Sequence, residues 1–240
     1  MHKQPPTLQL HEETAQILHR YNAAQAHNIV YTYDELRELG IPPEFLLALL
    51  EVFEDRLSFT AERFSGFPLW VIVDYLRKTH AYYLNKKLLE IEQSIHLLVN
   101  VYPRAHPLLL LLHNFYTEYK SHLISHIELE ERDLLPYIVQ LEQVAAGNGK
   151  LQSAPSMTVQ QFIQQHHDTE KDLDEVRKTI LSYSPPDGNQ TLYRILLSQL
   201  QVFEKDMAVH ALMEDDVLLP RALELEKKFI GSSRNSARQV

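Results

Sequence analysis

Two stretches of this 240-residue sequence repeat one pattern, His126-Ile-Glu-Leu-Glu-Glu-Arg-Asp-Leu-Leu-Pro136 and His210-Ala-Leu-Met-Glu-Asp-Asp-Val-Leu-Leu-Pro220. Each begins with a histidine, has a glutamate four residues later that is followed directly by a second acid, and ends in Leu-Leu-Pro. Because an α-helix turns by about 100° per residue, residues four apart lie on one face. Two such helices facing each other would offer nitrogen and oxygen ligands to a pair of transition-metal ions.

The composition is typical of a helical protein. Only 6 of the 240 residues are glycine, and 45% are hydrophobic. The absence of cysteine excludes disulfides, thiolate metal sites and iron–sulfur ligation. A formal net charge of −9 argues against nucleic-acid binding, which needs clustered Lys and Arg. No apolar run approaches the roughly 20 residues of a membrane helix, and the N-terminus has no apolar signal region. We therefore expect a soluble, cytoplasmic protein without nucleic-acid or membrane partners.

Proline and glycine divide the chain into a few long segments. Between them, apolar residues recur every three or four positions, which is the period of a helix with one buried face. The predicted helices cover residues 43–56, 68–100, 107–146, 158–182 and 190–230.

Four of these helices, joined by short or moderate loops, decide the predicted fold. We predict an all-α protein in which residues 67–230 form an up-down-up-down four-helix bundle. Residues 1–66 form an N-terminal helical appendage, and residues 231–240 form a flexible tail. The two copies of the motif lie on the second and fourth bundle helices, which are diagonal to each other.

The motif residues fall on the apolar stripes of their helices, His126 and Glu130 on one and His210 and Glu214 on the other. A carboxylate in an apolar core loses several kcal/mol of hydration. Two such carboxylates, each one turn from a core histidine, therefore need a cation.

The other two bundle helices each offer a core histidine. His80 lies near the middle of the apolar face of the first helix. In the third helix, His166 shares the face of Phe162 and Leu173, whereas His167 is rotated toward the polar side, so we choose His166. The predicted ligands of two metal ions are His80, His126, Glu130, His166, His210 and Glu214.

Neighbouring residues leave alternatives open. Glu131 and Asp215, one step off the ligand face, either orient a ligand histidine or are solvated. Tyr82 or Tyr83 could donate a hydrogen bond into the site, although packing is the favoured role. A single core histidine is usually a hydrogen-bonded structural residue, so the metal hypothesis depends on the repeat and on the shared stripe.

With these motifs the sequence resembles the hemerythrin-like superfamily and, more closely, the repair-of-iron-centres family of di-iron proteins, over residues 68–230. The second and last helix motifs of that family are matched by the two repeats, the last one extending through Pro220-Arg-Ala-Leu223. The third-helix pattern is matched by His166, Leu173 and Pro185-Pro186. Two features depart from the family pattern. His80-Ala81 stands where His-His is frequent in the family, and residues 1–66 lack the cysteines of the family's N-terminal segment.

The resemblance implies a non-haem di-iron centre, with two iron ions bridged by an oxo or hydroxo group, and a role in restoring iron–sulfur or other iron sites damaged by nitric oxide or peroxide. It implies as partner a small diatomic ligand, oxygen or nitric oxide, or an iron-acceptor protein. The alternatives are a sensing module that binds the ligand without turnover and a metal-free helical interaction domain. Nitrogen and oxygen ligands also suit manganese and zinc. Enzymatic turnover and oligomeric state stay open.

Overall fold

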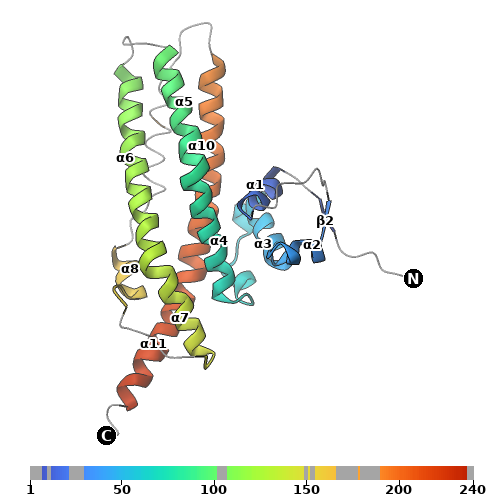
Figure 1. The fold of residues 1–240 in the computed structure, drawn as a ribbon, viewed down its shortest axis with the longest axis vertical. Coiled ribbons are helices and arrows are strands. Elements are labelled where there is room, and N and C mark those ends of the chain that lie inside the picture. The colour runs from blue at the N-terminus through green and yellow to red at the C-terminus, as the bar shows by residue number, and fades with distance from the viewer. Residues whose placement is uncertain are drawn as a thin grey trace, which may run out of the picture.

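The computed structural model describes residues 7–9, 12–21, 30–101, 107–148, 151, 155–165, 178 and 190–236. Apart from one short two-stranded sheet, the regular secondary structure of these residues is helical, and the long helices pack side by side (Figure 1). The predicted all-helical bundle with N-terminal helices is confirmed. No helix within these ranges has an apolar stretch long enough to cross a lipid bilayer.

Three of the predicted bundle helices are described along their length, and each consists of two α-helical segments joined by a π-helical turn. They are α4 (Leu69–Tyr82), η3 (Tyr83–Lys87) and α5 (Leu88–Val101); α6 (Pro107–Leu129), η4 (Glu130–Leu134) and α7 (Leu135–Ala145); and α10 (Gln190–Ala211), η5 (Leu212–Leu218) and α11 (Leu219–Ser236). Their ends lie close to the predicted positions, except that α11 continues to Ser236, into the segment for which a flexible tail was expected. α5 packs between α6 and α10 in the upper half of Figure 1.

The π-helical turns correct the expectation of regular α-helices, and two of them follow from the repeated Leu-Leu-Pro. The backbone N–H of Leu135 bonds to the carbonyl of Glu130, and that of Leu219 bonds to the carbonyl of Glu214. The next residue in each case is proline, which has no N–H and whose ring collides with the carbonyl four residues earlier in a regular α-helix. A wider turn relieves that collision, and such turns are frequent at functional sites.

The repeat extends further along the chain than the motif itself. Glu142 and Glu226 each stand 12 residues after a motif glutamate, and each accepts two backbone N–H groups at the start of another helix. Glu142 caps α4, where Pro68 has no side chain to do so, and Glu226 caps α8 (Val159–Gln165). α8 is the beginning of the predicted third bundle helix, and residues 166–177 and 179–189 lie outside the described part.

The described part of the N-terminal segment contains three α-helices, two short 3-10 helices and the sheet, and the sheet was not predicted from the sequence. Strand β1 (Thr7–Gln9) pairs antiparallel with β2 (Val30–Thr32). Helix α1 (Glu12–Arg20) lies between the two strands in the chain, and α2 (Tyr33–Glu38) and α3 (Pro43–Glu54) follow β2. Thr32 and Glu35 form a capping box that starts α2. α1 packs on α4 and α3 on α10, so this segment lies against the side of the bundle (Figure 1).

Buried apolar residues form two separate clusters, one in each half of the bundle. Along α4 and η3, the buried residues pass from Leu76 of the lower cluster to Tyr83 of the upper one, and His80 lies between them. In the same way, Glu130 lies between Ile127 and Leu134. A buried polar layer thus crosses the bundle where the predicted ligands are.

Candidate metal centre

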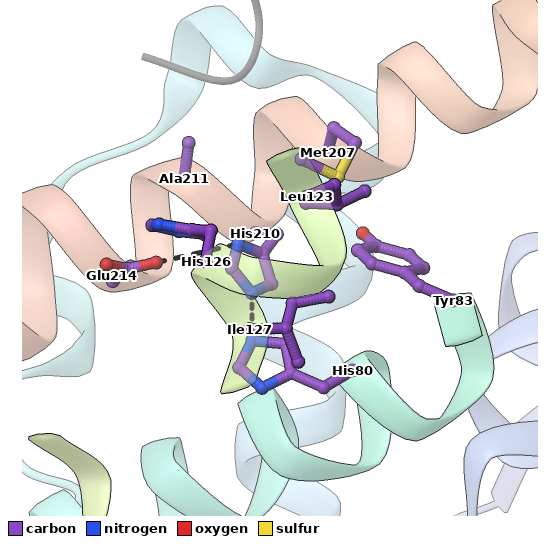
Figure 2. A pocket seen from close by; sticks show the side chains of 9 residues that line it. All are labelled: His80, Tyr83, Leu123, His126, Ile127, Met207, His210, Ala211 and Glu214. Carbon is purple, nitrogen blue, oxygen red and sulfur yellow. Dashed lines mark hydrogen bonds and ion pairs between the residues drawn. The ribbon is translucent and has the colours of Figure 1, made fainter. Parts of the chain in front are cut away.

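The structure brings five of the six predicted ligands together, and Figure 2 shows four of them around one cavity. His80 comes from α4, His126 from α6, and His210 from α10, while Glu130 and Glu214 belong to the π-helical turns η4 and η5. The sixth, His166, lies outside the described residues, as does its competitor His167. The choice between these two histidines stays a prediction.

Glu130 is the centre of the arrangement. Its Oε2 lies 3.1 Å from Nε2 of His80, and its Oε1 lies 2.7 Å from Nε2 of His126. Nε2 of His80 is also 2.8 Å from Nε2 of His210, whose Nδ1 is 3.7 Å from Oε2 of Glu214. Donor atoms bound to one ion at 2.0–2.2 Å are spaced about 3 Å apart, so these separations suit groups that share ions.

The donor atoms form two groups, each with its atoms within 4.8 Å of one another. One contains His80, Glu130 and His210, and the other contains His126, Glu130 and Glu214. Because Glu130 belongs to both groups and points one oxygen toward each, it has the position of a carboxylate that bridges two ions.

Burial makes these carboxylates costly unless positive charge compensates them. His80 and Glu130 are each 1% exposed, and Glu214 is 2% exposed. Among the described residues, neither oxygen of Glu130 makes a well-directed hydrogen bond, although each faces an imidazole nitrogen. A buried carboxylate without such bonds is costly unless it is paired with a cation or binds a metal. Imidazole and carboxylate donors suit iron, manganese or zinc, so the residues present fit a pair of such ions.

Protons balance the charges of these side chains when no ion does. Burial opposes a charge on His80, but the short contacts of its ring nitrogens with Glu130 and Glu131, and the negative charges of these two residues, outweigh burial and raise the pKa of His80 to about 9. Burial by itself would raise the pKa of Glu130, yet its contacts with His126 and His80 hold that pKa below its usual range. His80 is therefore an imidazolium next to an ionised carboxylate.

His210 and Glu214 are neutral when no ion is bound. Burial, followed by the positive charge of His80, lowers the pKa of His210 well below its usual value. Burial, followed by the negative charge of Glu130, raises the pKa of Glu214 well above its usual value. Metal binding would thus displace protons from His80 and Glu214, as ligands must be deprotonated to bind.

Of the two adjacent acids, Glu131 orients a predicted ligand. Its Oε1 lies 2.7 Å from Nδ1 of His80, and this contact turns Nε2 of the same ring toward the cluster. Its other oxygen is 3.3 Å from Nε of Arg77. Asp215, the equivalent acid of the second motif, is exposed.

A cavity of about 20 Å³ adjoins the cluster, with His80, His126, His210 and Glu214 on one side. Leu123, Ile127, Met207 and the ring of Tyr83 form its apolar wall (Figure 2). A water molecule needs roughly 10–15 Å³, so the cavity has room for a group of about that size and for no larger substrate. The hydroxyl of Tyr83 donates to Asp206 at 3.2 Å, so among the described residues its hydrogen bond is made to that carboxylate and not to a predicted ligand.

Two residues next to the site were not singled out from the sequence, Asp206 and Arg20. Asp206 stands four residues before His210, between the core residues Phe203 and Met207, and this spacing was a signal for a buried acid. Arg20 belongs to the N-terminal segment, and no local pattern links it to the bundle.

Comparison with known proteins agrees with this geometry. The model of the family described as Hemerythrin HHE cation binding domain matches residues 71–222, more than half of the chain. The chain belongs to the hemerythrin family. All five predicted ligands that the structure describes lie within the part that matches.

Relatives of this hemerythrin-family chain include proteins named for iron–sulfur cluster repair. The iron-sulfur cluster repair protein ScdA of Staphylococcus epidermidis is 21% identical over 150 residues, which are 62% of this chain and 65% of the relative. The iron-sulfur cluster repair protein YtfE of Pectobacterium carotovorum is 31% identical over 112 residues, 47% of each chain. The matched part thus spans less than two thirds of these relatives. The predicted resemblance to both the superfamily and the repair proteins is confirmed as a distant relationship.

Proposed function

We propose that this protein holds a non-haem di-iron centre and protects or restores iron–sulfur or other iron sites under nitrosative or oxidative stress. The observation that carries the proposal is the position of Glu130, which belongs to two groups of His and Glu donors at once. Relatives named iron-sulfur cluster repair proteins support the choice of iron and of this role. We propose the cytoplasm as its compartment.

The side chains have separate roles in this proposal. His80 and His210 would hold one ion, His126 and Glu214 the other, and Glu130 both. Glu131 keeps Nε2 of His80 directed at the cluster. Bound iron would supply redox chemistry and open positions for a small ligand, oxygen or nitric oxide, beside the cavity.

We assign the remaining ligand position to His166. The ring of Phe162 packs against that of His126, with the centroids 6.2 Å apart. Residue 166 stands four positions after Phe162, and this spacing puts two residues on one face wherever the chain is α-helical. The support for His166 therefore comes from the contact that Phe162 of α8 makes with His126.

The test of the centre is metal analysis with an optical spectrum, on protein purified from iron-supplied cells. We expect about two irons per chain and near-ultraviolet bands of a ferric pair. Glu130→Ala should lose most of the iron, whereas Glu128→Ala, an exposed acid two residues earlier on α6, should keep it. Equal iron content in both variants, or tightly held zinc without redox chemistry in the unaltered protein, would contradict the proposal.

The repair role needs a second test, because a centre that only binds its ligand would pass the first. Iron-loaded protein is mixed with an apo iron–sulfur protein and a sulfide source, and cluster formation is compared with that of the Glu130→Ala variant. Faster cluster formation supports iron delivery. The alternative, an oxygen or nitric oxide sensor without turnover, is favoured by the small cavity with its apolar wall. It predicts reversible ligand binding and no iron transfer.

A further inference from the structure

A buried ion pair connects the N-terminal segment to the helix that carries His210. Arg20, the last residue of α1, places Nη2 at 2.6 and 2.5 Å from the two carboxylate oxygens of Asp206 on α10. The side chains are 0% and 2% exposed. Removing both charges from water is costly, and such a pair persists only where further polar contacts support it.

Those contacts come from α4, next to a predicted ligand. Nη1 of Arg20 donates to the hydroxyl of Tyr75 at 3.1 Å and to Oγ1 of Thr79 at 2.9 Å. The guanidinium also lies over the rings of Tyr75 and Tyr82, 5.6 and 5.2 Å from their centroids. Thr79 directly precedes His80, so Arg20 holds the turn of α4 that bears this ligand.

The same pair reaches the second ligand through Tyr83. Asp206 precedes His210 by one helical turn, and its Oδ1 accepts the hydroxyl of Tyr83 at 3.2 Å. The ring of Tyr83 lies 5.9 Å from that of His210 and packs edge-on against Phe203 at 5.1 Å. Figure 2 shows this ring at the edge of the cavity. The position of Tyr83, and with it one wall of the site, therefore depends on a carboxylate that Arg20 neutralises.

We propose that Arg20 is a positioning residue of the metal centre, through which the N-terminal segment orients Tyr83, His80 and His210. Among the described residues it contacts none of the predicted donor atoms, and it acts through Asp206 and Thr79. The inference rests on the metal-binding part of the proposed function and is independent of iron delivery. A purely structural anchor would change the stability of the protein but not the affinity or the spectrum of a metal bound in the folded protein.

The test is a cobalt(II) titration of the full-length apoprotein, which gives the Kd and the visible absorption bands of the bound ion. Arg20→Met removes the charge and keeps the apolar stem. We expect its Kd to rise about 10–100-fold, the effect typical of lost supporting contacts around metal ligands, with a shift of the visible bands. Arg20→Lys should restore part of the affinity. An ammonium can pair with Asp206, but it lacks the planar set of donors with which a guanidinium reaches several acceptors at once.

The matched control is Lys86→Gln. Lys86 also joins the N-terminal segment to the bundle, with Nζ 3.2 Å from Nε2 of His19, but it contacts neither Asp206 nor Thr79. Its Kd and spectrum should equal those of the unaltered protein. A change as large as that of Arg20→Met would mean that any weakening of this contact disturbs the site, and it would overturn the specific role of Arg20.

Removing one partner of a buried ion pair can unfold a protein, so the test includes two further variants. Arg20→Met combined with Asp206→Leu removes both charges, a replacement that often preserves stability. Tyr83→Phe keeps the ion pair and removes only the hydroxyl. Both should weaken cobalt binding, and the effects of Arg20→Met and Tyr83→Phe, where both fold, should be less than additive.

The outcomes separate this inference from the proposed function. The inference alone is overturned if the unaltered protein binds cobalt and two variants bind it with nearly the same affinity. These variants are the folded Arg20→Met/Asp206→Leu protein and Tyr83→Phe, and their Kd values would lie within twofold of the Kd of the unaltered protein. No cobalt binding by the unaltered protein would overturn both.

Discussion

The shared position of Glu130 predicts that two similar substitutions have unequal effects. Glu130→Gln removes a charged donor from both groups, whereas Glu214→Gln removes one only from the group that contains His126. Both replacements keep the volume of the side chain, so neither creates a cavity. We expect Glu130→Gln to retain fewer than one iron per chain and Glu214→Gln to retain about one.

The expected change in Tm follows from the linkage of metal binding to folding. Each ion present at 100 times its Kd stabilises the folded state by about 2.7 kcal/mol, so two ions contribute about 5.4 kcal/mol. For a chain of this size, 1 kcal/mol shifts Tm by about 2–4 °C, and two ions correspond to about 11–22 °C. Glu130→Gln should lose most of this increment, and Glu214→Gln about half of it.

The assay is thermal unfolding of each variant with and without metal, together with metal analysis of the same samples. The difference between the loaded protein and its own apoprotein removes any effect of the substitution on the apoprotein. Glu128→Gln serves as the exposed control on the same helix and should keep the full increment. Equal increments in Glu130→Gln and Glu214→Gln would refute the reasoning that one carboxylate serves both ions.

Three further results are expected. The apoprotein should lose stability as pH rises: the pKa of His80 is raised to about 9 in the folded state, so its contribution is fully present below about pH 6.5 and lost through pH 9. Urea unfolding at pH 6 and 9.5 measures this loss, of which His80 should contribute about 3 kcal/mol, and His80→Asn should remove that contribution. His166→Ala should lose bound metal while His167→Ala keeps both ions, and metal analysis showing the reverse would reject the assigned helix face. Glu131→Gln should weaken metal affinity about tenfold, seen by competition with a chelator, because Nδ1 of His80 loses its charged acceptor; unchanged affinity would leave Glu131 a solvated acid.

The repeated motif predicted donor groups that lie close together in the structure, because its information is local. Helical periodicity relates His126 to Glu130, and His210 to Glu214, without knowledge of any other segment. Apolar stripes then indicated that both pairs face a core, and His80 followed from the same rule. These five residues are the ones that the structure brings together.

Other features depended on contacts that no local pattern contains. The π-helical turns had a signal in Leu-Leu-Pro, but η3 has no proline after it, and nothing in the structure explains that turn. The pairing of β1 with β2 joins segments more than 20 residues apart. Strand pairing of this kind depends on the packing of neighbours more than on intrinsic preference.

The sequence by itself determined the helices, their buried faces and the chemistry of the donor set, because these depend on spacing within single segments. Only the tertiary structure decided that Glu130 lies between His80 and His126, and that Glu131 contacts Nδ1 of His80. It also brought Arg20 to Asp206, 186 residues later in the chain. An ion pair of this kind forms where two remote surfaces exclude water together, and that exclusion is a property of the packed molecule rather than of either segment.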